Sequence, residues 1–144
     1  MNAAEKIHGA IKDFRGLSMV SSFVHDNQAH RFMQVTKTWK STGSGELANF
    51  LATAVEQQDY NNGTITVRGY GTSHHANGDL SYFSWEGTAQ VIPEHIPDLT
   101  GKGKFKWLGG TGKFEKLSGH GTYTCIRQGN LTPLECQWEG EYKL

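Results

Sequence analysis

The sequence lacks an excess of charge of either sign, because 14 basic and 14 acidic side chains in 144 residues give a formal net charge of zero. Proteins that bind nucleic acid usually carry a basic excess that neutralises phosphates, so we expect no nucleic-acid partner. No apolar run approaches the roughly 20 residues of a membrane-spanning helix. Residues 1–15 are charged throughout and hold no continuous apolar stretch, which argues against a signal peptide. These absences predict a cytoplasmic protein that does not contact a membrane.

Cysteine is scarce, since the chain has only Cys125 and Cys136. In a reducing compartment two small buried thiols are the favoured interpretation, and a cross-link is the alternative if the two residues lie opposite each other. Metal ligands are not grouped either. His74 and His75 are adjacent, and adjacent strand residues point to opposite faces, so one ion would not readily meet both rings. We therefore expect no metal site.

Glycine, in contrast, is abundant, with 18 residues spread through segments of alternating apolar and polar character. Glycine within a strand pattern marks bulges, corners or close backbone approach, which a twisted and closed sheet requires. The alternation predicts seven or eight strands with short turns and no crossover helices. This pattern favours an all-β fold, an antiparallel closed β-barrel of about eight strands and calycin-like shape, formed by residues 1–144 as a single domain.

Two segments depart from the simple strand pattern. Ile7, Ile11 and Phe14 recur at spacings of four and three residues, which predicts a short helix over residues 3–14 that ends before Gly16. The apolar residues of segment 46–58 also suit a helix face. The turns on both sides of that segment favour a long strand instead.

The hairpin over residues 64–91 is indicated by Asn77-Gly78, which is typical of a two-residue type I′ turn. With that turn, Tyr70 lies opposite Trp85, and Glu86 lies opposite Gly69. Glu86 is a candidate proton-transfer residue if its face points into the barrel, and a solvated side chain if it does not.

The other face of this hairpin is the alternative interior. It would form a pocket for an aromatic ligand, with Arg68 or His74 holding a polar end, or else an ordinary core and rim. The residues of this face are Arg68, Tyr70, His74, Phe83 and Trp85. The two faces cannot both point inward.

A last hairpin runs over residues 121–144 around a turn at 129–133. Centred there, it pairs Cys125 with Cys136 and Tyr123 with Trp138. These four residues then share one face, and polar residues occupy the other. Such separation predicts that the face with the aromatic residues is buried and the other is wet.

The stretch GGTGKFEKLSGHGTYT, residues 109–124, resembles the late hairpin of allene-oxide-cyclase-like barrels, a group that includes dirigent proteins and small bacterial barrels. Glu115-Lys116 stands where that pattern carries a glycine. The resemblance extends over about the last 80 residues. It implies a barrel whose relatives shape flexible hydrophobic substrates without metals or organic cofactors and often assemble as dimers or trimers. It implies no catalytic residue, because no functional motif of those relatives matches.

Together these observations predict that the barrel handles a small hydrophobic molecule, as a cofactor-independent isomerase, cyclase or lyase. The candidate catalytic residues are Glu86, Tyr70 and His74. The candidate ligand-binding residues are Arg68, Phe83, Trp85, Trp39, Tyr123 and Trp138. A non-catalytic hydrophobic-ligand-binding or dirigent-like barrel is the alternative, and an oligomer subunit with a filled core is a third hypothesis.

Overall fold

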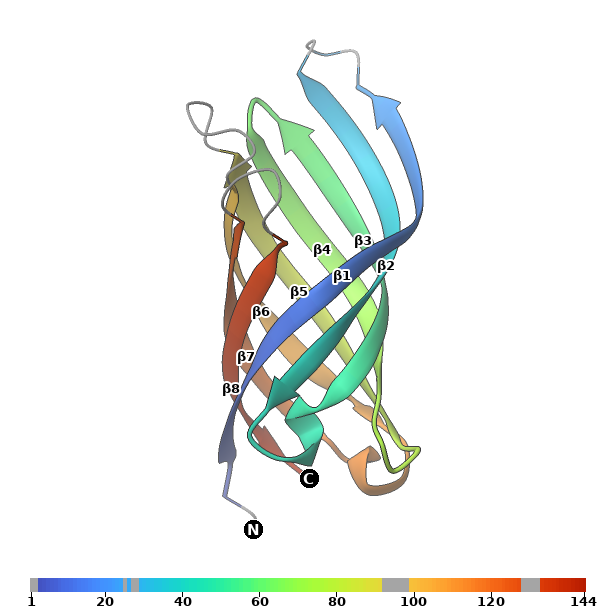
Figure 1. The fold of residues 1–144 in the computed structure, drawn as a ribbon, viewed down its shortest axis with the longest axis vertical. Helices are drawn as coiled ribbons and strands as arrows, with labels where there is room; N and C mark the ends of the chain where they lie inside the picture. The colour runs from blue at the N-terminus through green and yellow to red at the C-terminus, as the bar shows by residue number, and fades with distance from the viewer. Residues whose placement is uncertain (1–2, 25, 27–28, 92–98, 128–132) are drawn as a thin grey trace.

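The chain forms a closed antiparallel barrel of eight strands in a computed structural model that describes all residues except 1–2, 25, 27–28, 92–98 and 128–132 (Figure 1). Each strand is hydrogen-bonded to the next one in the sequence, and the last pairs with the first. The strands are β1 (Glu5–Phe23), β2 (His30–Gly43), β3 (Phe50–Asn61), β4 (Thr64–His74), β5 (Leu80–Val91), β6 (Leu99–Gly110), β7 (Ser118–Arg127) and β8 (Glu135–Lys143). The predicted all-β barrel is therefore confirmed. Within the described residues, no helix has the length and apolar character needed to cross a membrane.

The predicted N-terminal helix is wrong, because residues 5–23 form β1. Ile7, Gly9 and Ile11 point inward at the strand period of two. A bulge between Lys12 and Arg15 then interrupts the pairing with β2. After this bulge the side chain that packs against the core is that of Phe14. A strand with a bulge thus reproduces the spacing of four and three residues that is typical of a helix.

The predicted register of the β4–β5 hairpin is wrong by one residue. Its loop has three residues, Ala76–Gly78, because the His75 amide donates to the Asp79 carbonyl at 3.1 Å. Gly78 takes a left-handed φ of 90°, as expected for a type I turn that ends in a bulge. Trp85 therefore pairs with Gly69 and not with Tyr70. The tight two-residue turn occurs instead at Asn62-Gly63, where the φ angles are 52° and 83°.

The register of the last hairpin is confirmed, since Tyr123 pairs with Trp138 and Cys125 with Cys136. The favoured interpretation of two free thiols is wrong, because the two cysteines form a disulfide that joins β7 to β8. The strand favoured for segment 46–58 is confirmed from Phe50 onward and follows a short 3-10 turn, η1 (Glu46–Ala48). The turn predicted at 129–133 and most of the loop predicted at 92–100 lie outside the described residues.

Aromatic rings inside the barrel lie directly over glycines on neighbouring strands. Four inward-facing rings each cover the glycine paired with them, at a position where a Cβ would overlap the ring. These ring and glycine pairs are Trp85 and Gly69, Phe83 and Gly71, Phe105 and Gly121, and Trp138 and Gly9. The missing side chains leave room for the rings, which fill the interior and cover the exposed glycine backbone.

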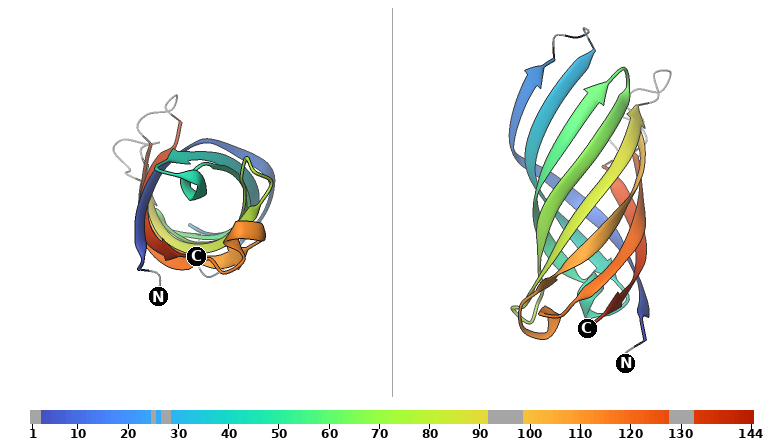
Figure 2. Two further views of the ribbon diagram at one scale, coloured as in Figure 1. Left: turned by 90° about the horizontal axis from the view of Figure 1, so that it is seen from below. Right: turned by 180° about the vertical axis from the view of Figure 1, so that it is seen from behind.

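One end of the barrel is closed by η1 and by a second 3-10 turn, η3 (Gly112–Phe114). In the left view of Figure 2, η1 lies inside the outline of the barrel. Beneath it His75 is buried with its ring 4.6 Å from that of Phe114. His75 Nδ1 lies 3.2 Å from the carbonyl oxygens of Glu46 and Asn49, so this nitrogen carries the hydrogen. Nε2 then accepts a hydrogen bond from the Ser81 hydroxyl at 2.8 Å, which fits a neutral ring.

We expect Gly71→Ala to destabilise the protein by about 1–3 kcal/mol, because the added methyl group would overlap the ring of Phe83. Phe83 cannot easily retreat, since the rings of Trp39 and Trp85 lie 5.8 and 5.6 Å away. Gly101→Ala is the matched control, because its Cβ would lie 3.4 Å from its nearest neighbour. Urea unfolding measures both variants. Equal stabilities of the two variants would show that the rings do not require these glycines.

Burial lowers the pKa of His75 below the ordinary value of 6.5, although its backbone partners oppose the shift. The unfolded chain therefore binds more protons than the folded one below pH 6.5, and stability should fall as the pH falls. The pKa of His30 is raised, chiefly by its hydrogen bond to Asp26, so its contribution is lost as the pH rises above 6.5. Urea unfolding between pH 6.5 and 5 should show a weaker pH dependence in His75→Gln than in wild type. His74, the exposed neighbour of His75, serves as the control. The variant His74→Gln should show the same pH dependence of stability as wild type.

Candidate functional site

Above the closed end, the barrel interior holds a cavity of about 210 Å³ with a mainly aromatic and aliphatic lining. The rings that form this lining pack at angles to one another. Trp39 and Trp85 meet edge to face with centroids 5.5 Å apart, and Phe105 meets Trp138 in the same way at 5.6 Å. The indole N–H of Trp138 donates to the Ser41 hydroxyl at 3.0 Å, so its polar atom is satisfied inside the barrel.

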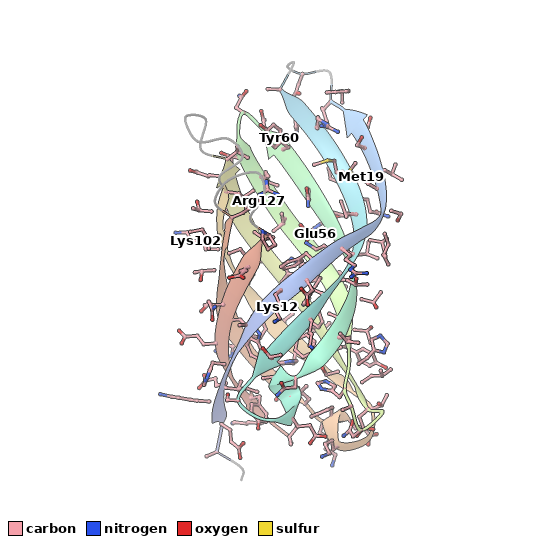
Figure 3. The ribbon with its side chains drawn as sticks, in the orientation of Figure 1. Lys12, Met19, Glu56, Tyr60, Lys102 and Arg127 are labelled. Atoms are coloured by element: carbon pink, nitrogen blue, oxygen red, sulfur yellow. A yellow bond between two sulfur atoms is a disulfide. The ribbon has the colours of Figure 1, made fainter. Side chains whose placement is uncertain are left out.

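An ion pair lies in this apolar interior. Lys37 of β2 and Glu56 of β3 both line the cavity, and the Lys37 ammonium contacts the Glu56 carboxylate. The Glu56 side chain is only 4% exposed. Gln58 donates to Glu56 Oε1 at 2.9 Å. Figure 3 labels Glu56, which is seen between the upper part of β1 and β8.

The Lys37 ammonium is also surrounded by aromatic rings. Its Nζ lies 5.5 Å from the ring centroid of Phe14, 5.6 Å from that of Trp39 and 5.9 Å from that of Trp85. Cations are attracted to the faces of aromatic rings at such distances, and more strongly when water is excluded. The rings and the carboxylate together therefore compensate for the removal of this charge from water.

Tyr123 adds a hydroxyl group to the interior. The hydroxyl lies against Gly87 and Gly103, where a side chain on either glycine would overlap it. Burial raises the pKa of Tyr123 well above its usual value, and the nearby Glu56 and Glu86 carboxylates add to the shift. Tyr123 therefore stays protonated across the physiological pH range and can donate a hydrogen bond.

Four sequence-predicted residues lie on the outer surface of the barrel. Glu86 is exposed and pairs with Lys104 at 3.1 Å, and Tyr70 is 70% exposed. His74 is exposed, and Arg68 donates to Gln57 at 2.9 Å on the outside. The expectation that Arg68, Tyr70 and His74 share the face of Trp85 is wrong, because the three-residue loop pairs Trp85 with Gly69. The alternative in which Glu86 points inward is wrong because its neighbour Trp85 lines the cavity.

The remaining predicted residues line the cavity, and their role in ligand binding stays a prediction. They are Trp39, Phe83, Trp85, Tyr123 and Trp138. The sequence analysis missed Lys37, Glu56 and Gln58. The alternation contained a signal for Lys37, because it lies between Val35 and Trp39 on the face predicted to be apolar. Nothing in the local pattern of β3 indicated that Glu56 would meet it.

The described part of the chain has no group of three or more His, Cys, Asp or Glu side chains that could hold a metal ion. The fold and the cavity define a class, the eight-stranded antiparallel β-barrels with an interior that can hold a small molecule. No protein-family model matches the chain, and no curated protein is similar to it.

We expect Glu56→Gln to destabilise the fold by about 3 kcal/mol, because it leaves the Lys37 ammonium buried without a counter-charge. Lys37→Met should have a comparable effect, because it leaves the Glu56 carboxylate buried without a counter-charge. The double variant should be more stable than the sum of the single effects predicts, which double-mutant analysis of urea unfolding measures. Glu86→Gln, which breaks the exposed pair with Lys104, should cost at most about 1 kcal/mol. Strictly additive single effects would show that Lys37 and Glu56 do not interact.

Proposed function

We propose that this protein binds a small, largely apolar molecule inside the barrel. The cavity of about 210 Å³ above the closed end carries this proposal. Ligand sites are typically concave and apolar, with a few polar groups that fix orientation, and this lining has that composition. An apolar cavity of about 150 Å³ can hold benzene, so a single substituted ring is the appropriate size of ligand.

The polar groups of the cavity favour a second candidate function, a cofactor-independent isomerase, cyclase or lyase. The specific observation is the buried Glu56 carboxylate, which lies beside the space that a ligand would occupy. A carboxylate in that position can take a proton from bound substrate and return it elsewhere, while Lys37 or Tyr123 donates to a substrate oxygen. In this hypothesis Glu56 has the role that the sequence analysis gave to Glu86.

The resemblance to allene-oxide-cyclase-like and dirigent-like barrels, and the calycin-like shape, stay proposals of the same kind, which the closed antiparallel barrel of eight strands supports. The predicted cytoplasmic location is not supported by the disulfide between Cys125 and Cys136, because such cross-links are rare in a reducing cytosol. The proposal of a ligand-binding barrel therefore does not include a cytoplasmic location.

Thermal unfolding with indole, p-cresol and camphor tests the binding proposal. A ligand at 100 times its Kd should stabilise the folded state by about 2.7 kcal/mol and raise Tm. Ala89→Leu, which projects into the cavity, should remove this shift. Gln90→Leu, on the outward face of the same strand, should retain it. No shift with any of the probes, or a shift that survives Ala89→Leu, would contradict interior binding.

The same samples in heavy water distinguish binding from catalysis. Deuterium uptake into an acidic C–H position of a bound probe, monitored by NMR, should be lost in Glu56→Gln if this carboxylate moves protons, at a temperature at which circular dichroism shows that the variant is folded. Binding without uptake supports the simple binding barrel.

A further inference from the structure

The upper half of β1 has one edge without a strand partner among the described residues. β1 pairs with β2 as far as Phe23, whereas its pairing with β8 extends only from Glu5 to Ile11. In Figure 1 the upper part of β1 is separated from β8. The backbone from Lys12 to Phe23 therefore presents N–H and C=O groups that can pair with a further strand.

This free edge is also apolar. The described part of the chain has eleven exposed large hydrophobic residues, and five of them lie on the β1–β2 hairpin. They are Leu17, Met19, Val20, Phe23 and Phe32, with exposed fractions from 41% to 73%. Figure 3 labels Met19 on this part of β1. Such a concentration of exposed apolar side chains marks an interaction surface.

Both faces of the edge contribute to this surface. Met19 pairs with Val35 and Val20 with Gln34, so successive side chains point to opposite sides of the sheet. Natural edge strands are usually protected by charged residues or proline. Residues 16–24 contain neither. The edge begins with the charged residues Lys12, Asp13 and Arg15 and is bulged against β2 as far as Ser18, so the part that is open to strand addition is the stretch from Ser18 onward.

We propose that a second copy of this chain pairs with the free edge of β1, antiparallel and around a two-fold axis near Met19. Antiparallel pairing sets the uncharged residues 16–24 of one copy against the same residues of the other, so no like charges meet.

The zero net charge of the chain also favours self-association, because two copies do not repel each other at long range. A two-fold interface buries the same apolar side chains from both copies and satisfies the backbone edge of each. This dimer is independent of the ligand proposal, since Phe14 is the one residue of the segment from Lys12 to Phe23 that lines the cavity.

Sedimentation velocity of the full chain tests the dimer. Wild type at about 100 µM should sediment as twice the monomer mass of 16.0 kDa. Val20→Lys places two like charges close to the axis and should weaken dimerisation at least about tenfold. Val20 is 73% exposed, so the substitution should not disturb the fold, and circular dichroism checks this. Tyr70→Lys, at a similarly exposed position on β4, is the matched control and should leave the dimer intact.

Cross-linking tests the register. Met19→Cys should form a disulfide with its copy under mild oxidation, which doubles the mass on a non-reducing gel. Leu51→Cys, equally exposed on β3, should not. A monomeric wild type, or a dimer that Val20→Lys leaves unchanged, overturns the proposed interface. A dimer that depends on Val20 but does not cross-link through Met19→Cys overturns the position of the axis.

Discussion

The packing of aromatic rings over cross-strand glycines is the interaction on which the barrel depends. Trp85, Phe83, Phe105 and Trp138 each lie on the glycine opposite them, and a single added methyl group at these glycines would overlap a ring or the adjoining backbone. A closed sheet of eight strands has a narrow interior, so large side chains fit only where their neighbours are small. The glycines therefore make the closure of β8 onto β1 compatible with an interior filled by large rings.

The same packing explains why a polar pair can exist in the interior. The rings of Phe14, Trp39 and Trp85 lie 5.5 to 5.9 Å from the Lys37 ammonium, and Glu56 neutralises its charge. The pair is costly to bury, and hydrophobic residues of similar volume often serve stability as well or better. Its position beside a cavity gives it a functional interpretation, because a ligand entering that space meets both charges. Substitution of Lys37 or Glu56 alone should therefore destabilise the folded state, in addition to any effect on proton transfer.

Within the described part of the chain, turns close one end of the barrel, whereas toward the other end β1 separates from β8. The turns η1 and η3 and the buried His75 fill the closed end, whereas β1 leaves β8 after Ile11. The chain therefore presents a cavity and a free strand edge in the upper half of one molecule. The cavity is suited to a small molecule, and the free strand edge is suited to another copy of the chain.

The sequence by itself determined the all-β class, most of the strands other than the first part of β1, and the face of the last hairpin. Alternation is a local property, and the predicted pairing of Tyr123 with Trp138 is confirmed. It also gave Trp39, Phe83 and Trp85 as candidate ligand-binding residues, and these three side chains line the cavity. The composition also indicated a closed sheet, because a barrel filled with large rings requires many glycines.

Only the tertiary structure decided which side of β4 points inward, because one residue in a loop reverses every side chain of a strand. The three-residue loop at residues 76–78 places Tyr70, His74 and Arg68 on the outer surface, whereas Glu86 lies outside because its neighbour Trp85 lines the cavity. The bulge after Lys12 likewise produced helix-like spacing in a strand. Lys37 and Glu56 meet across two strands, and the two cysteines bond rather than remain thiols. Contacts between strands depend on register and closure, which no single segment of the sequence contains.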